Sequence, residues 1–354
     1  MKKTSKYIAK QDMLIVDAMQ RLDENAGGVL YIVDSEDRLI GSLSDGDIRR
    51  WILRSGDVRT TVDQAMQAGV RFVEQKNRDN ASDVLIKNKI TSLPIVDDEG
   101  HIVDIYIPRK KQRETSDALK KTAVIIMAGG EGTRLYPYTK ILPKPLIPID
   151  EVPILERIMN RFASYGAEDF YLIVNYRKEM IRSYFYDLSP DYRVHFIDED
   201  KPLGTAGGIR LIGDSFDEPV IVTNCDTLIL AEYDQLLQEH KSAKNRMTIV
   251  SSVKETVMPY GILHVGEDGS VRSIEEKPSY SNLINTGMYV LDPELLSYIP
   301  EDTFFHMTDL IEVLMEKGES IGMYPISENS FLDMGEFEQM QRMERLLSER
   351  VRIE

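Results

Sequence analysis

Residues 123–135 read Ala-Val-Ile-Ile-Met-Ala-Gly-Gly-Glu-Gly-Thr-Arg-Leu. The apolar run at the start predicts a buried strand, and the glycines that follow allow the backbone to approach a phosphate and present its amides. Arg134 adds a permanent charge with a fork geometry that suits phosphate. No Gly-Lys-Ser/Thr follows, so this is not a Walker loop, and the glycine spacing is not that of a dinucleotide fingerprint. Taken alone, the glycines are equally consistent with a plain tight turn.

A lysine enclosed by prolines follows this loop, in Pro143-Lys144-Pro145-Leu146. Each proline restricts its own backbone and that of the residue before it, so Lys144 is held in place. We therefore expect Lys144 to stabilise phosphate charge rather than to lie in a solvated loop.

Strand-like and helix-like segments alternate from residue 120 onwards, which predicts an α/β domain with a mostly parallel sheet. Ligands of such sheets bind at the carboxyl ends of the strands. The expected strands are Ala123–Met127, Phe170–Val174, Val220–Thr223 and Met247–Ser252. The expected helices are Ile154–Tyr165, Arg177–Tyr186, Asp234–Lys241, Met307–Lys317 and Phe337–Glu349.

The first 107 residues contain an internal repeat, since Val33-Asp34 and its surroundings recur around Val96-Asp97. Each copy predicts a strand, an acidic turn and a second strand, preceded by an amphipathic helix near Ile15–Asp23 or Ala81–Asn88. A following helix is predicted only for the first copy, with Ser44 as its N-cap.

This repeat resembles a tandem pair of CBS domains over roughly residues 8–107, chiefly through Leu39-Ile40-Gly41 and Ser44-Asp-Gly-Asp-Ile-Arg-Arg50. In that family a Ser/Thr and an Asp three residues later contact the ribose of an adenine nucleotide, which here implies Ser44 and Asp47. A helix N-cap with a first-turn acid explains the same two residues equally well. The second copy lacks this pattern, so at most one ribose clamp is expected. A paired module also suggests regulation or a homo-oligomer.

The polar stretch Pro108 to Asp117 predicts a linker. We therefore expect a tandem CBS module over residues 1–107, a linker over 108–121 and a larger domain over 122–354. The basic cluster of the linker is interpreted as a solvated segment; it consists of Arg109, Lys110, Lys111 and Arg113.

The glycine loop and the Pro-Lys-Pro segment are similar to the signature of the sugar-1-phosphate nucleotidyltransferase (sugar-nucleotide pyrophosphorylase) family. Further motifs occur in family order: Gly204-Thr-Ala-Gly207, Asn224-Cys-Asp226, Tyr260-Gly261, Glu276-Lys-Pro278, Asn285-Thr-Gly287 and Phe331-Leu-Asp-Met-Gly335. The resemblance covers the whole second domain and implies a Rossmann-like α/β fold with a mixed, mostly parallel sheet.

The resemblance also implies roles for individual residues. Catalytic cations would be Arg134, Lys144 and Lys277. The nucleotide would contact Ala128, Gly129, Gly130, Gly132, Thr133, Glu199, Gly204 and Thr205. The sugar would contact Gly261, Glu276, Asn285 and Thr286. Neighbours in a strand point to opposite faces, so Glu276 and Lys277 require a bend to face one ligand, and Pro278 favours that bend.

Asp226 follows an apolar strand and is expected at the carboxyl edge of the sheet, where a carboxylate suits Mg²⁺. Asp333 would supply the second carboxylate; either acid could instead cap a turn. The implied reaction needs no covalent nucleophile: a phosphate oxygen of a sugar 1-phosphate attacks the α-phosphorus of a nucleoside triphosphate, and pyrophosphate leaves.

Glu199 precedes Gly204 closely, at a position that faces the base in the family. A carboxylate only accepts hydrogen bonds, and guanine offers two adjacent donors, which favours GTP over UTP or dTTP. Glu199 could instead belong to a solvated acidic run, Asp198-Glu199-Asp200. A CBS pair ahead of this transferase resembles the glucosamine-1-phosphate guanylyltransferases of legionaminic acid biosynthesis; a mannose-1-phosphate guanylyltransferase and a nucleotide-sensing regulatory subunit are the alternatives.

Composition argues against a nucleic-acid-binding, membrane or secreted protein. The 354 residues carry 43 Lys+Arg against 59 Asp+Glu, a net charge of −16, so the chain should repel nucleic acid and anionic membranes. The single cysteine, Cys225, cannot form an internal disulfide, and neither a membrane-spanning run nor a secretory signal is expected. These features predict a cytoplasmic protein.

Overall fold

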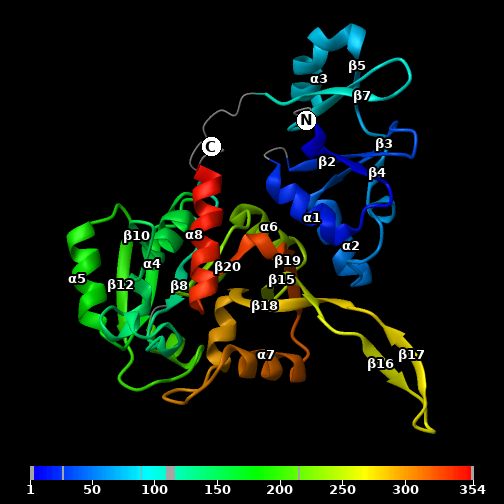
Figure 1. Ribbon diagram of the computed structural model, residues 1–354. Coiled ribbons are helices and arrows are strands. Elements are labelled where there is room, and N and C mark those ends of the chain that lie inside the picture. Colours follow the sequence, from blue (N-terminus) through cyan, green and yellow to red (C-terminus); the bar gives the residue numbers. More distant parts are fainter. Residues whose placement is uncertain (1–3, 26–27, 89, 109–115, 214–215, 352–354) are drawn as a thin grey trace. The chain divides into compact units, whose positions relative to one another are not determined.

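The computed structural model describes residues 4–351 except 26–27, 89, 109–115 and 214–215 (Figure 1). The chain forms two compact units. The larger contains residues 113–251, 285–324 and 330–354, and the smaller contains 1–112, 252–284 and 325–329. The basic cluster of the expected linker lies outside the described residues. The predicted boundaries at residues 107 and 121 stay a prediction.

A seven-stranded sheet forms the centre of the larger unit. Its order is β12 (Arg193–Asp198), β11 (Asp169–Val174), β8 (Val124–Met127), β13 (Val220–Asn224), β18 (Ser279–Leu291), β15 (Met247–Val257) and β19 (Ile321–Ile326). The first four of these strands are parallel, and β18 runs antiparallel to β13. The structure therefore confirms the mixed, mostly parallel α/β fold.

The helices of this unit begin and end within a few residues of the predicted positions. They are α4 (Ile154–Ala163), α5 (Lys178–Leu188), α6 (Tyr233–Ser242), α7 (Met307–Glu316) and α8 (Phe337–Val351). Helix α4 shows why these helices could be predicted from the sequence. Its buried residues recur at helical spacing and form one apolar face; they include Leu155, Ile158, Met159 and Phe162.

Short elements complete the larger unit. The two-stranded sheets are β9 (Pro148–Ile149) with β10 (Val152–Pro153), and β14 (Thr227–Ile229) with β20 (Phe331–Asp333). The single turns of 3-10 helix are η4 (Thr133–Leu135), η5 (Tyr138–Lys140), η6 (Lys144–Leu146), η7 (Gly207–Leu211) and η8 (Pro293–Tyr298). Several of these turns carry predicted site residues.

The smaller unit contains the sequence repeat. The first copy forms a sheet of β1 (Ile8–Lys10), β2 (Val29–Val33), β3 (Leu39–Ser44) and β4 (Gln67–Ala68), with α1 (Ile15–Glu24) and α2 (Asp45–Ser55). The second forms β5 (Val73–Glu74), β6 (Leu93–Val96) and β7 (Ile102–Tyr106), with α3 (Ala81–Asn88). The 3-10 turns here are η1 (Ser5–Tyr7), η2 (Val62–Gln64), η3 (Gln75–Asn80) and η9 (Glu328–Ser330). Among the described residues only the first copy is followed directly by a helix, as predicted.

The hairpin of β16 (Ile262–Val265) and β17 (Val271–Glu275) forms an isolated two-stranded ribbon (Figure 1). Its cross-strand register pairs Leu263 with Ile274, and both side chains are more than half exposed. The ribbon leads directly into the predicted Glu-Lys-Pro motif.

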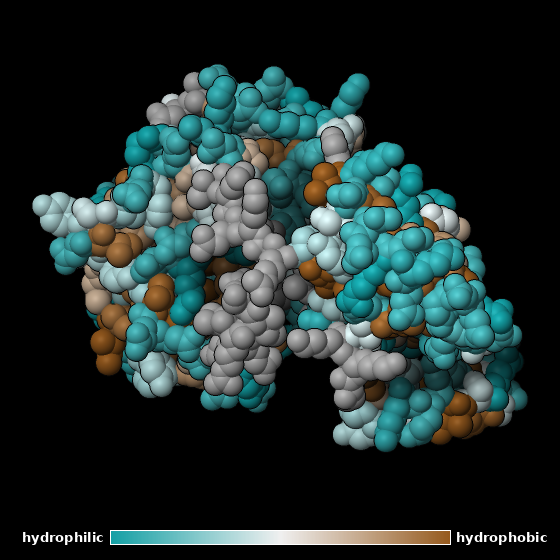
Figure 2. Space-filling view, turned by 90° about the horizontal axis from the view of Figure 1, so that it is seen from above, coloured by the Kyte–Doolittle hydropathy of each residue, from teal (hydrophilic) through white to brown (hydrophobic). Residues whose placement is uncertain are grey.

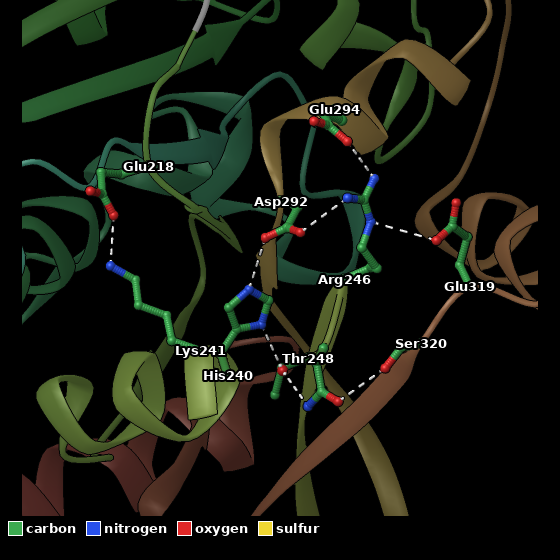
Figure 3. Close-up of polar contacts among 10 residues, drawn as sticks. Glu218, His240, Lys241, Arg246, Thr248, Asp292, Glu294, Glu319 and Ser320 are labelled. Atoms are coloured by element: carbon green, nitrogen blue, oxygen red, sulfur yellow. Dashed lines mark hydrogen bonds and ion pairs between the residues drawn. The ribbon is translucent and has the colours of Figure 1, made fainter. Parts of the chain in front are cut away.

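A polar network around the buried His240 ties α6 to the starts and ends of three strands (Figure 3). His240 lies between the hydroxyl of Thr248, at 2.9 Å, and the carboxylate of Asp292, at 3.3 Å. Arg246 forms ion pairs with Asp292 and with Glu294. Leu291 pairs with Val220 at the start of β13, so Asp292 and the network lie at the amino end of that strand.

None of the described helices combines the length and apolar character that crossing a bilayer requires. Hydrophilic residues predominate on the face drawn in Figure 2, which agrees with a chain in which 29% of the residues are charged.

Candidate active site

The carboxyl ends of three parallel strands meet at one edge of the central sheet. In the register, Met127 at the end of β8 pairs with Ile173 near the end of β11 and with Asn224 at the end of β13. The glycine loop, Asn175 and Asp226 follow these strand ends directly. The topology thus brings together residues that are far apart in the sequence.

Gly132 shapes the loop after β8. Its φ is +65°, in the left-handed region, and a Cβ there would lie 3.0 Å from side-chain carbons of both Lys144 and Thr139. The hydroxyl of Thr139, which is fully buried, donates to the carbonyl of Gly132 at 2.9 Å. Gly130 differs, because it is exposed and a Cβ there would meet nothing within 4 Å.

Lys144 is buried and paired with a carboxylate. Only 7% of the residue is exposed, and its Nζ forms an ion pair with Oδ2 of Asp226. A buried ammonium requires such a partner. The loop lysine and the strand-end aspartate therefore form one charged centre.

The ladder between β14 and β20 places Asp333 beside this centre. Asp333 pairs with Thr227, the residue after Asp226, and the amide of Met334 donates to the carbonyl of Asp226 at 2.9 Å. Burial, with the nearby charge of Asp226, raises the pKa of Asp333, while the cations Lys144 and Arg134 oppose that rise. The four predicted charged residues thus share one electrostatic environment.

Two carboxylates whose charges repel each other at a partly buried site suit a divalent cation. Among the described residues, no group of three or more His, Cys, Asp or Glu side chains could hold a metal ion. This donor set fits Mg²⁺, which keeps several waters and takes further oxygens from substrate phosphates rather than from an all-protein cage.

Glu199 is buried, with 6% of the residue exposed, whereas Asp198 and Asp200 beside it are exposed. It is therefore not part of a solvated acidic run. Its Oε1 accepts a hydrogen bond from the amide of Leu203 at 3.0 Å, and burial raises its pKa. A Cβ at Gly129 would lie 2.9 Å from its Oε2, so the carboxylate borders the glycine loop.

The Gly204-Thr205 segment is fixed by contacts with residues 305–307. Gly204 has a φ of +84°, and a Cβ there would lie 2.5 Å from the carbonyl oxygen of Phe305. The hydroxyl of Thr205 accepts a hydrogen bond from the amide of Met307, the first residue of α7, at 3.0 Å. These contacts hold the segment against α7, near Glu199 in the sequence.

The Asn285-Thr-Gly287 motif lies on β18, next to the end of β13. Gly287 has a φ of +81°, and a Cβ there would lie 2.4 Å from the amide nitrogen of Asn224. Thr286 is buried and its hydroxyl donates to the carbonyl of Val250 at 2.7 Å. Asn285 is exposed, with its amide nitrogen donating to the hydroxyl of Tyr289.

Three predicted residues, Gly261, Glu276 and Lys277, lie in the smaller unit, at the base of the β16–β17 hairpin. A Cβ at Gly261 would lie 2.8 Å from Oε2 of Glu276. Lys277 has a φ of +46°, so the chain turns sharply between β17 and β18. The bend predicted from Pro278 is present.

Ser44 and Asp47 form a capping box at the start of α2. The Ser44 hydroxyl accepts from the amide of Asp47 at 3.2 Å, and the Asp47 carboxylate accepts from the amide of Ser44 at 2.9 Å. Burial acts to raise the pKa of Asp47, but hydrogen bonds from Ser44, Gln67 and Arg50 outweigh it and lower that pKa. The capping role is thus present in the structure, and a nucleotide clamp stays a prediction.

Sequence reasoning missed the segment Asn175-Tyr176-Arg177, which follows β11 at the same sheet edge. The side-chain Nδ2 of Asn175 donates to the carbonyl of Glu199 at 2.6 Å, and the hydroxyl of Tyr176 donates to the carbonyl of Thr139 at 3.2 Å. The rule that ligands bind at strand carboxyl ends could have drawn attention to this polar triplet.

Two protein-family models match the chain. The model described as "Nucleotidyl transferase" matches residues 123–350, and the model described as "CBS domain" matches residues 4–54. The CBS match thus covers the first copy of the repeat.

Several curated relatives are named as sugar-1-phosphate nucleotidyltransferases. A UTP–glucose-1-phosphate uridylyltransferase of Synechocystis sp. is 30% identical over 214 residues, 55% of each chain. The catalytic subunit beta of a mannose-1-phosphate guanylyltransferase of Drosophila pseudoobscura pseudoobscura is 35% identical over 185 residues, 50% of each chain. The chain spans between half and three fifths of the length of the first relatives it matches.

Among solved structures, HddC of Yersinia pseudotuberculosis is similar with a TM-score of 0.50 and 28% identity. The alignment covers 63% of this chain and 98% of that one.

Proposed function

The chain belongs to the nucleotidyl transferase family, and on that premise we propose that it transfers a nucleoside monophosphate from a nucleoside triphosphate to a sugar 1-phosphate. The observation that carries this proposal is the charged centre of Lys144, Asp226 and Asp333 beside a glycine loop at the carboxyl edge of the sheet. Fixed cations next to two carboxylates suit a triphosphate and a divalent cation, and the proposed reaction needs no covalent nucleophile.

The proposed reaction is a displacement at phosphorus. An oxygen of the sugar 1-phosphate forms a bond to the α-phosphorus, the bond from that phosphorus to the bridging oxygen of the β-phosphate breaks, and pyrophosphate leaves. Arg134 and Lys144 stabilise charge on the triphosphate, and Lys277 neutralises the attacking phosphate. The backbone of Ala128 to Thr133 cradles the phosphates, so catalysis consists of positioning and electrostatic stabilisation.

Asp226 and Asp333 would hold Mg²⁺, which, when bound, neutralises phosphate charge. Lys144 forms an ion pair with Asp226, so a positive charge lies beside one of the two carboxylates that would hold the metal. The β14–β20 ladder and the backbone hydrogen bond from Met334 to Asp226 place the backbones of the two aspartates side by side.

We infer that the base is guanine. Burial of Glu199 leaves one of its oxygens beside Gly129, and a carboxylate there accepts both hydrogen bonds that N1–H and the 2-amino group of guanine offer. The relatives include guanylyltransferases and a uridylyltransferase by name, so UTP and dTTP are the alternatives.

Glucosamine 1-phosphate is the proposed acceptor, because a CBS module precedes the transferase as in the guanylyltransferases of legionaminic acid biosynthesis. Mannose 1-phosphate is the second candidate, favoured by the names of several relatives. Gly261, Glu276, Asn285 and Thr286 are the proposed sugar contacts. Because Thr286 already donates to Val250, its part would be to fix β18 beside the sugar.

The N-terminal module is proposed to bind an adenine nucleotide through Ser44 and Asp47, and the protein to act in the cytoplasm as a homo-oligomer. Calorimetry with AMP, ADP and ATP tests the nucleotide. Heat that disappears in Asp47→Ala supports it, and no heat with any of the three refutes it.

Pyrophosphate release tests the enzyme proposal, with Mg²⁺, four nucleoside triphosphates and the 1-phosphates of glucosamine, N-acetylglucosamine, mannose and glucose. Release with GTP and one sugar supports the full proposal. Release with UTP or dTTP retains the reaction but refutes the guanine assignment. Silence with every pair favours a nucleotide-sensing regulatory subunit.

A further inference from the structure

Arg177 stands where local structure disfavours it. It is the N-cap of α5, a position at which Ser, Thr, Asp or Asn accept hydrogen bonds from the first free amides. Arginine has no acceptor, and its side chain makes no capping bond here. Its charge also opposes the positive end of the helix dipole.

The backbone of Arg177 adds a second local cost. Its φ is +50°, in the left-handed region that a residue with a Cβ rarely adopts. A residue that breaks several local rules at once is typical of a functional site. The reason for Arg177 must therefore lie outside its own helix.

The side chain of Arg177 reaches the continuation of the glycine loop. Its Nη2 donates to the carbonyl of Lys140 at 2.7 Å, and its Nε donates to the hydroxyl of Tyr176 at 2.9 Å. The Tyr176 hydroxyl in turn donates to the carbonyl of Thr139 at 3.2 Å, and the guanidinium lies over the Tyr176 ring. Two neighbouring carbonyls of η5 are thus held by one coupled pair of side chains.

This contact continues directly to the phosphate loop. Thr139 donates its hydroxyl to the carbonyl of Gly132, and Gly132 packs against Lys144. The amide of Tyr176 also donates to the carbonyl of Gly129, at 3.4 Å. Residues 176–177 therefore contact the glycine loop at its start and, through Thr139, at its end.

Asn175 extends the same segment to Glu199, the proposed reader of the base, because its side-chain Nδ2 donates to the carbonyl of Glu199 and its Cβ borders Gly129. Three consecutive residues thus donate to four carbonyls, which belong to Gly129, Thr139, Lys140 and Glu199. All four lie on or beside the proposed nucleotide site.

We propose that Arg177, acting with Tyr176, is a positioning residue that fixes the phosphate loop for the nucleoside triphosphate. This inference rests on the proposed nucleotide-binding function of the loop. Neither side chain is assigned a contact with substrate, and their effect passes through the carbonyls of Thr139 and Lys140.

Steady-state kinetics of Arg177→Ala, Arg177→Lys and Tyr176→Phe test the proposal, with each substrate varied separately. A hydrogen bond to a charged donor typically contributes enough to change an equilibrium about ten- to one-hundredfold. We expect Arg177→Ala to raise the KM for GTP about tenfold and to leave the KM for the sugar 1-phosphate within twofold. Arg177→Lys should recover part of the loss, since lysine can reach one carbonyl but cannot bridge to Tyr176.

The control is Arg193→Ala. Arg193 is an exposed arginine that pairs with Asp169 at the far, amino end of β11, so its removal costs an ion pair without touching the loop. It should leave both KM values unchanged. The double variant of Tyr176 and Arg177 should lose less binding free energy than the sum of the two single losses, because the two side chains are hydrogen-bonded to each other.

Equilibrium binding of GTP with Mg²⁺, measured by calorimetry, gives a readout that does not need turnover. If Arg177→Ala retains wild-type GTP affinity, or if the KM values of both substrates rise together, the positioning role is refuted. If Arg177→Ala does not fold, the same GTP affinity and KM measurements are made on Tyr176→Phe. Wild-type protein that turns over no substrate pair would refute the proposed function, whereas active wild type with an unaffected Arg177→Ala refutes only this inference.

Discussion

Substitution of two glycines of the phosphate loop distinguishes a residue needed for ligand binding, Gly130, from one needed for stability of the fold, Gly132. Gly130→Ala introduces a methyl group that meets nothing within 4 Å at a residue whose φ is not positive. We expect the free energy of unfolding to stay within about 0.5 kcal/mol, or to rise slightly because alanine restricts the unfolded chain. Binding of the triphosphate should nevertheless fall, since the methyl group occupies the exposed side of the loop.

Gly132→Ala should behave differently. At a φ of +65° the left-handed backbone costs alanine ~1–2 kcal/mol, and the contacts at 3.0 Å with Lys144 and Thr139 add ~1–2 kcal/mol of crowding. For a domain of this size each kcal/mol lowers the Tm by ~2–4 °C, so we expect a decrease of ~4–16 °C.

Calorimetric melting and GTP titration of the two variants form the assay. Loss of one charge-assisted hydrogen bond from the loop to a phosphate weakens binding by ~1.5–3 kcal/mol, which is ~10- to 150-fold. Gly130→Ala should therefore combine a wild-type Tm with a loss of GTP affinity in that range. A Gly130→Ala protein that binds GTP as tightly as the wild type would refute the view that this glycine lies against a phosphate.

Further predictions concern four charged or titratable residues. Glu199→Gln keeps the oxygen that accepts from Leu203 but removes the carboxylate, whose pKa is raised by burial. It should therefore increase the Tm at pH 7, with the gain vanishing below ~pH 4, and it should weaken the preference for GTP over UTP. An unchanged Tm at pH 7 would contradict the burial argument. Asp226→Ala should abolish pyrophosphate release while near-ultraviolet circular dichroism still shows a native fold, and full activity would exclude a metal role. Burial lowers the pKa of His240, although Asp292 opposes this shift. The unfolded chain therefore binds a proton more readily than the folded protein, so the free energy of unfolding should fall as the pH drops below ~6.5. His240→Gln should reduce this pH dependence of the Tm. Asp47→Ala should cost ~1 kcal/mol of stability through the lost cap, measured by urea unfolding, and a cost near zero would contradict the capping role.

Local pattern explains why the helices and strands could be predicted. The apolar positions of α4 recur at helical spacing, and the run before the glycine loop is continuous because β8 is a central strand buried on both faces. Glycine, proline and serine then located the loop, Lys144 and the cap of α2, since each acts through its own backbone or side chain.

Contacts between distant residues could not be predicted in this way. The ion pair of Lys144 with Asp226 spans 82 residues, and the ladder that places Asp333 beside Asp226 joins β14 to β20. The role of Glu199 was equally undecided, because the sequence Asp198-Glu199-Asp200 is the same whether the segment is solvated or lines a pocket. Only the structure shows that Glu199 is buried while its two neighbours are exposed.

The sequence by itself determined the alternation of strands and helices in the larger domain, the chemistry of the phosphate loop and the family to which the chain belongs, because these depend on residues close together in the chain. The tertiary structure alone decided which side chains share the site. Arg177 is the clearest case: its sequence neighbours give no reason for an arginine at a helix N-cap, and the reason becomes visible only when the fold brings the carbonyl of Lys140 within 2.7 Å of it.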